Sequence, residues 1–183
     1  MRIAVFALVC FGVAGCATTK PLVPREYLDE QTAATITVVA DPVVFVHERE
    51  AVTARGRDFL SLYGIDVNRM GEHRQYIAVL QWAPPEEIST PQVPELELHL
   101  NQQPIVLQPA KQSARELGIA QPLAESYSYN ATWWYFPVDK EVMRRMAEAR
   151  EMSAAMVLPQ RRIQYVMLND GRAQLGELTA VLP

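Results

Sequence analysis

The two cysteines, Cys10 and Cys16, are the residues whose chemistry the sequence constrains most clearly. Both lie near the start of the chain, and Cys16 comes directly after the small residues Ala14 and Gly15. An apolar run over residues 3–11 contains Cys10 and precedes Cys16, with a single arginine in front of it. One basic residue, a short apolar run and small residues are, in this order, typical of a cleaved secretory signal. The run is about half of the roughly 20 residues that a membrane-spanning helix needs.

The stretch Val13-Ala14-Gly15-Cys16 resembles the lipobox of bacterial lipoprotein signal peptides. The resemblance implies that Cys16 receives a thioether-linked diacylglycerol, that residues 1–15 are removed, and that the new amino terminus is acylated, for instance with palmitate. Two or three chains then give stable membrane anchoring, because each buried methylene contributes about 0.8 kcal/mol. The resemblance covers residues 1–17 only.

The residue after the cysteine bears on localisation. Ala17 stands where an aspartate is associated with retention in the inner membrane of enteric bacteria. By this analogy we expect a lipid anchor in the outer membrane, with the domain facing the periplasm. The sorting rule is looser outside the enteric bacteria, so the inner membrane stays as the alternative.

Processing of this kind would leave no free thiol, since Cys10 departs with the signal and Cys16 carries lipid. A domain without thiols suits an oxidising compartment and excludes both thiol catalysis and cysteine-ligated metals. The formal charge of −4 falls to about −5 once Arg2 is removed, and the domain has no basic cluster. A mildly acidic domain of this kind argues against a nucleic-acid partner.

The remaining residues do not form a known catalytic motif. His47, His73 and His99 are far apart and never form the close pair that a helical metal site uses. The sequence has no G-x-S-x-G elbow, phosphate-binding glycine loop or dinucleotide fingerprint. The acidic pair Glu86-Glu87 is more typical of a solvated loop than of acid–base catalysis. We therefore predict no catalytic residue, metal or cofactor, and favour a non-enzymatic role.

The most unusual composition is an aromatic stretch over residues 127–136. Strand alternation would place four of its rings on one face and two on the other. The four are Tyr127, Tyr129, Trp133 and Tyr135, and the two are Trp134 and Phe136. A strand with bulky residues on both faces is expected to be central and covered on each side. The four rings could stack on a sugar or another planar ligand, but filling a core is the favoured interpretation.

Period-two alternation predicts strands in most of the remaining chain. The expected strands cover residues 35–39, 43–47, 63–67, 76–82, 95–100, 105–107, 153–158 and 163–168. Gly71 marks the turn of one hairpin. Asp139 is expected to cap a helix over residues 139–151, in which the apolar residues recur at helical spacing. The end of the chain, residues 172–182, fits either a helix or a last strand.

These elements predict an α+β fold, mainly antiparallel and sandwich-like, with one clear helix and a possible C-terminal helix. The expected organisation is a signal peptide (1–15), a lipidated tether (16–34) containing Pro21 and Pro24, and a single globular domain (35–183).

Two hypotheses for function follow. The first is a membrane-anchored, non-catalytic structural or interaction module of the cell envelope, with the membrane bound through Cys16 and an unidentified protein partner. The second is a ligand-binding or hydrolytic domain that acts on envelope polymers through the aromatic stretch. The oligomeric state stays open.

Overall fold

The computed structural model describes residues 23–48, 56–82, 93–124 and 131–183. In order along the chain, the elements are β1 Arg25–Asp29, β2 Ala34–Val38, β3 Val43–Glu48, β4 Arg57–Arg69, β5 Glu72–Trp82, β6 Glu95–Leu100, β7 Gln103–Leu107, β8 Ala131–Val138, α1 Lys140–Glu148, β9 Met152–Leu158, β10 Arg161–Asn169 and α2 Arg172–Val181. All strand pairs are antiparallel. The mainly antiparallel α+β prediction is thus confirmed.

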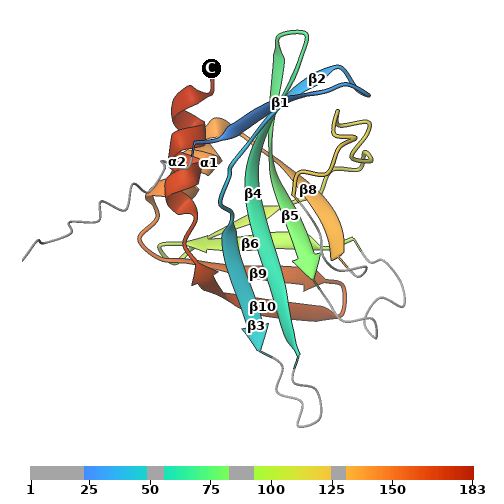
Figure 1. Ribbon diagram of the computed structural model, residues 1–183. Coiled ribbons are helices and arrows are strands. Elements are labelled where there is room, and N and C mark those ends of the chain that lie inside the picture. Colours follow the sequence, from blue (N-terminus) through green and yellow to red (C-terminus); the bar gives the residue numbers. More distant parts are fainter. Residues whose placement is uncertain (1–22, 49–55, 83–92, 125–130) are drawn as a thin grey trace, which may run out of the picture.

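The long strand β4 organises the sheet (Figure 1). One edge of β4 pairs with β5 over residues 59–69, and β5 in turn pairs with β8. The other edge is shared: residues 65–68 pair with β2, and residues 57–62 pair with β3. The chain passes from β2 to β3 through Asp41-Pro42, where a proline without an N–H marks the break in the ladder.

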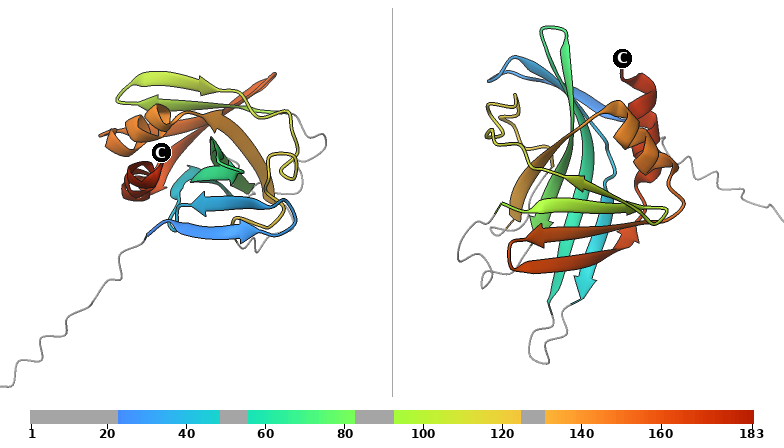
Figure 2. Two further views of the ribbon diagram at one scale, coloured as in Figure 1. Left: turned by 90° about the horizontal axis from the view of Figure 1, so that it is seen from above. Right: turned by 180° about the vertical axis from the view of Figure 1, so that it is seen from behind.

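The hydrogen-bonded ladder then continues from β3 through β10, β9 and β6 to β7. Figures 1 and 2 show that β6, β9 and β10 run across the direction of β3, β4 and β5. The main core lies between these two parts and contains Phe45, Leu62 and Phe136 from one part and Leu98 and Tyr165 from the other. Because all strands belong to one connected sheet, the sandwich-like expectation is not confirmed.

Helix α1 matches the predicted helix, although it ends earlier. The side chain of Asp139 accepts a hydrogen bond from the Val142 backbone N–H at 2.7 Å, which is the expected N-cap. Met143 and Met146 are buried in the main core. The helix ends at Glu148, so the last three residues of the predicted helix lie outside it.

The end of the chain forms the second helix, α2, which resolves the open alternative in favour of a helix. Helix α2 lies beside α1 (Figure 1) and packs Leu175 and Leu178 over Gly64 of β4. A Cβ at Gly64 would lie 2.6 Å from Leu175 Cδ2, so the close approach of α2 depends on this glycine. In the described part of the chain, neither helix has the length and apolar character that crossing a membrane requires.

The predicted tether needs a correction at its C-terminal end. Residues 25–29 form β1 and pair with β2 in register from Arg25↔Val38 to Asp29↔Ala34. Asp29 is fully buried, and Tyr27 packs against buried side chains. The domain therefore begins before Thr35, because β1 buries side chains that a solvated tether would leave in water.

The aromatic strand β8 also differs from its expected place. Both of its faces are at least partly covered, as the bulky side chains predict, but in the described ladder it pairs only with β5. Pro137 lies within it, and a proline is tolerated at a sheet edge because it has no N–H to donate. Among the described strands, β8 is therefore an edge strand rather than a central one.

Candidate functional site

Three aromatic side chains meet on the face of the sheet that points away from the main core. The rings of Trp133 and Tyr135 stack with centroids 6.3 Å apart and an interplanar angle of 17°. The ring of Tyr63 on β4 lies 5.5 Å from Trp133 in a tilted arrangement. All three side chains are half-buried, and we call them, with Tyr27, the aromatic face. Phe136, the next residue of β8, is fully buried in the main core on the opposite side.

The aromatic face borders a second apolar cluster. Its buried members are Ala34, Ile36, Val38, Ile65, Val67, Tyr76, Ala78, Leu117, Ile119 and Leu123. The last three belong to residues 108–124, a segment without helix or strand that we call the strap. It lies beside β8 and the β1–β2 hairpin (Figures 1 and 2). The strap therefore supplies the cover that the outer face of the sheet needs.

Burial changes the acidity of the tyrosines in this region. It raises the pKa of Tyr135 to about 12, and it also raises the pKa of Tyr63 and Tyr27 above the usual value. The hydroxyls stay neutral at physiological pH, so these side chains can stack and donate hydrogen bonds but cannot serve as general bases. In the described part of the chain, the buried Tyr27 hydroxyl has no hydrogen-bond partner.

A buried carboxylate joins the strap to the first hairpin. Asp29 Oδ1 accepts from the backbone N–H groups of Gln31 and Thr32 at 3.1 and 3.3 Å. Its Oδ2 accepts from the backbone N–H groups of Ala120 and Gln121 at 2.6 and 2.8 Å. Burial alone would raise the pKa of Asp29, but these four hydrogen bonds favour the charged form and together lower it.

This arrangement predicts an acid-dependent part of the folding stability. Because the folded-state pKa of Asp29 lies below its unfolded value of about 3.9, the stabilisation is present above that pH and is lost as pH falls through the folded-state pKa. We expect Asp29→Asn to lower the free energy of unfolding by about 1.5–3 kcal/mol at pH 7. Urea unfolding of both proteins between pH 7 and pH 3 should show this difference shrinking, and a constant difference would contradict the assignment.

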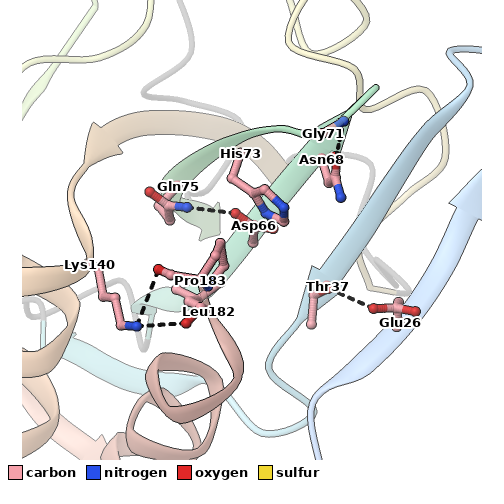
Figure 3. A network of polar contacts seen from close by, with 10 residues as sticks. All are labelled: Glu26, Thr37, Asp66, Asn68, Gly71, His73, Gln75, Lys140, Leu182 and Pro183. Carbon is pink, nitrogen blue, oxygen red and sulfur yellow. Dashed lines mark hydrogen bonds and ion pairs between the residues drawn. The ribbon is translucent and has the colours of Figure 1, made fainter.

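A second buried carboxylate lies near the tip of the β4–β5 hairpin (Figure 3). Asp66 accepts from His73 Nδ1 and from Gln75 Nε2, both at 2.7 Å. The Asp66 side chain is 3% exposed and the His73 side chain 29% exposed. A carboxylate that holds Nδ1 leaves Nε2 of the imidazole as the outward nitrogen, which is how a general base is oriented. In the described chain no Ser, Thr or Cys side chain is hydrogen-bonded to His73, so a paired nucleophile is not assembled there.

A third polar cluster lies on the outer face of β6 and β10. Glu97 binds Arg162 at 2.9 Å and His99 Nε2 at 2.6 Å. These contacts, above all the hydrogen bond from Arg162, lower the pKa of Glu97. A shallow groove of about 160 Å³ runs beside them, lined also by Ser153 and Gln164. The charges of this cluster largely satisfy one another, which leaves it suited to binding polar groups rather than to proton transfer.

The structure brings together only part of the predicted aromatic set. Trp133 and Tyr135 are adjacent, whereas Tyr127 and Tyr129 lie outside the described residues. Cys16, the predicted lipid attachment site, also lies outside them. Within the described ranges, no three His, Cys, Asp or Glu side chains are grouped as a metal site would require.

Comparison with known proteins gives no family for this chain. No protein-family model, no curated protein and no solved structure matches it. The function proposed below is therefore supported by the chain's own residues alone.

Proposed function

We propose that this protein is a lipid-anchored lipoprotein of the bacterial cell envelope, held at Cys16 and serving as a non-catalytic structural or protein-interaction module. The observation that carries the proposal is the stretch Val13-Ala14-Gly15-Cys16 behind Arg2 and a short apolar run. The outer membrane, with the domain facing the periplasm, is the proposed location, because Ala17 follows the cysteine.

The start of the fold supports a position close to the membrane. Only residues 17–24 separate Cys16 from the first strand, which begins at Arg25. A fully extended chain spans at most about 3.6 Å per residue, so this connection reaches roughly 30 Å. A partner of the domain would therefore be met near the membrane surface.

An exposed apolar surface on β10 supports an interaction role. Val166 and Leu168 are 63% and 57% exposed, and Val166 pairs with Val46 of β3. Val166 and Leu168 are two positions apart on one strand, and burial of such an exposed apolar pair would favour contact with a partner. The proposed partner is a protein that buries this surface, which we call the β10 surface.

Replacing Cys16 with serine tests the anchor. We expect the Cys16→Ser precursor to stay uncleaved and without lipid, because an alcohol cannot form the thioether. Metabolic labelling with a fatty acid would report lipid attachment, electrophoretic mobility would report cleavage, and fractionation of cells would report the membrane in which the protein lies. If the Cys16→Ser protein were found in the outer-membrane fraction as the wild-type protein is, the lipobox interpretation would be wrong.

Crosslinking and affinity capture from membranes test the interaction role. We expect the wild-type protein to yield one reproducible partner and Val166→Asp to lose it, because a charge on the β10 surface must be desolvated on contact. Val106→Asp is the matched control, since Val106 is an exposed valine on a different strand, β7. Recovery of the wild-type protein as a free monomer under every condition would contradict the interaction role.

The second candidate function is ligand binding at the aromatic face. The stacked, half-buried rings of Trp133 and Tyr135 favour it, because a partly exposed aromatic surface can stack on sugars or other planar groups. The ligand would come from envelope polymers.

A further inference from the structure

We infer that the β1–β2 hairpin is a latch that holds the strap, residues 108–124, over the aromatic face, so that displacement of β1 uncovers the rings of Tyr63, Trp133 and Tyr135. The strap has no helix or strand of its own and lies on the sheet through the buried side chains of Leu117, Ile119 and Leu123. Its attachment therefore depends on side-chain burial and on a small number of hydrogen bonds to other parts of the chain.

Those hydrogen bonds come mainly from the first hairpin. Asp29 accepts from two backbone N–H groups of the strap, at Ala120 and Gln121. Thr32 Oγ1 donates to the Gly118 carbonyl at 2.7 Å, and Arg25 Nη2 donates to the Leu123 carbonyl at 2.8 Å. The hairpin thus contacts the strap at both ends of β1 and at the turn.

Packing at Gly118 shows that the strap lies tightly against the sheet. Gly118 has a φ of +98°, and a Cβ there would lie 3.0 Å from Val67 Cγ1 and 3.3 Å from Ala34 Cβ. At the other end of the strap, the Ala110 N–H donates to the Tyr135 carbonyl at 2.7 Å. The strap thus bridges the first hairpin and the aromatic strand.

Strand β1 is weakly held by comparison. It has five residues and, among the described strands, pairs only with β2. Arg25, Glu26 and Leu28 are exposed, so its attachment depends on the ladder, on Tyr27 and on Asp29. Strand β2 in contrast is fixed by a second ladder to β4. Displacing β1 therefore requires less free energy than displacing a strand that pairs on both edges. It also removes Arg25 and Asp29, two of the three side chains that bind the strap.

The register of the hairpin fixes how β1 would leave. Arg25 pairs with Val38, next to the point where β2 joins the rest of the domain, and Asp29 pairs with Ala34 at the turn. A displacement that starts at the N-terminal end of β1 separates one residue pair after another, beginning with Arg25. The bond to Leu123 is lost first and the Asp29 bonds last, which leaves Thr32 as the one hairpin side chain of the three that still binds the strap.

Hydrogen exchange measured by mass spectrometry on the full chain in detergent micelles tests the latch. We expect Asp29→Asn to accelerate exchange in residues 25–38 and in the strap by a common factor of roughly 10 to 100. Strands β6, β9 and β10 should keep their wild-type rates. Glu97→Gln, which removes one carboxylate charge on the other part of the sheet, is the matched control and should leave the strap unchanged.

Two further variants keep the inference falsifiable if Asp29→Asn fails to fold. Thr32→Val removes the hydroxyl that donates to the Gly118 carbonyl and should accelerate hydrogen exchange in the strap by a smaller factor than Asp29→Asn does. Leu123→Ala weakens the packing of the strap itself and should accelerate hydrogen exchange in β1 as well, because coupling between two sites is reciprocal. Faster exchange in the hairpin with unchanged exchange in the strap would overturn the latch. Acceleration of exchange by the same factor in every segment would also overturn it, because that result indicates global unfolding.

Discussion

A chain that starts at Thr35 is expected to be less stable than one that starts at Val23 by at least about 3 kcal/mol. The shorter chain lacks β1, and with it the packing of Tyr27 and the buried carboxylate of Asp29. The N–H groups of Ala120 and Gln121 then lose their acceptor, and the strap loses all three hairpin side chains that bind it, since Thr32 is removed together with Arg25 and Asp29. Since small domains have only about 5–15 kcal/mol of stability, this loss is a large fraction of the total.

Chemical unfolding of the two chains at neutral pH measures this difference. A third chain that starts at Arg25 is the control, because it removes residues 23 and 24 and retains all of β1. It should unfold at the same denaturant concentration as the chain that starts at Val23. Equal midpoints for the Thr35 chain and the Val23 chain would mean that β1 contributes nothing to the fold, as a tether would.

Long alternating strands could be predicted because their pattern is local. In the β4–β5 hairpin, apolar and polar side chains alternate on each strand, and Gly71 adopts a φ of +90° in the turn. Both strands extend further than the predicted ranges. Strand β4 begins at Arg57 and contains the buried polar residue Asp58, and β5 begins at Glu72 in a run of polar residues, so apolar alternation does not mark either start. The capped helix α1 was predictable for the same reason, because the Asp139 side chain and the Val142 N–H that donates to it lie in one turn.

The first strand could not be predicted in this way. It has five residues and lies between prolines and charged residues that are typical of a linker. The residues next to Asp29 in the sequence indicate an exposed, solvated carboxylate. Its burial depends on hydrogen bonds from the backbone N–H groups of Ala120 and Gln121, about 90 positions away. A local pattern holds no information on such partners. Nor does apolar and polar alternation mark the strand, since Leu28 is exposed and Asp29 is buried.

The position of β8 was mispredicted although a local signal existed. Bulky side chains on both faces indicated burial on both sides, and this was taken to mean a central strand. Burial of the two faces and pairing of the two edges are separate properties, however, and Pro137 bears on the edges. The strap and the main core cover the faces, while one edge stays outside the ladder.

Phe136→Ala and Trp133→Ala are expected to differ in their effect on stability. Phe136 is fully buried in the main core, and its truncation should lower the free energy of unfolding by about 3–5 kcal/mol. Trp133 is only half-buried on the aromatic face, so a smaller loss of about 1–3 kcal/mol is expected. Trp134, between them in sequence, packs against the main core and donates from Nε1 to Gln81 at 3.0 Å.

The same pair of variants separates the two candidate functions of the aromatic face. Each variant is unfolded in urea beside its parent and is then titrated, under folded conditions, with soluble peptidoglycan and lipopolysaccharide fragments. If Trp133 serves only as packing, its replacement shifts the unfolding midpoint, and neither the parent nor the variant binds. If Trp133 stacks on a ligand, the parent binds a fragment, Phe136→Ala retains that binding in proportion to its folded fraction, and Trp133→Ala loses it. We expect the first result, because Trp133 packs between Tyr63, Tyr135 and the second apolar cluster. A stability change below about 1 kcal/mol for Trp133→Ala, together with lost binding, would make ligand recognition the function of this face.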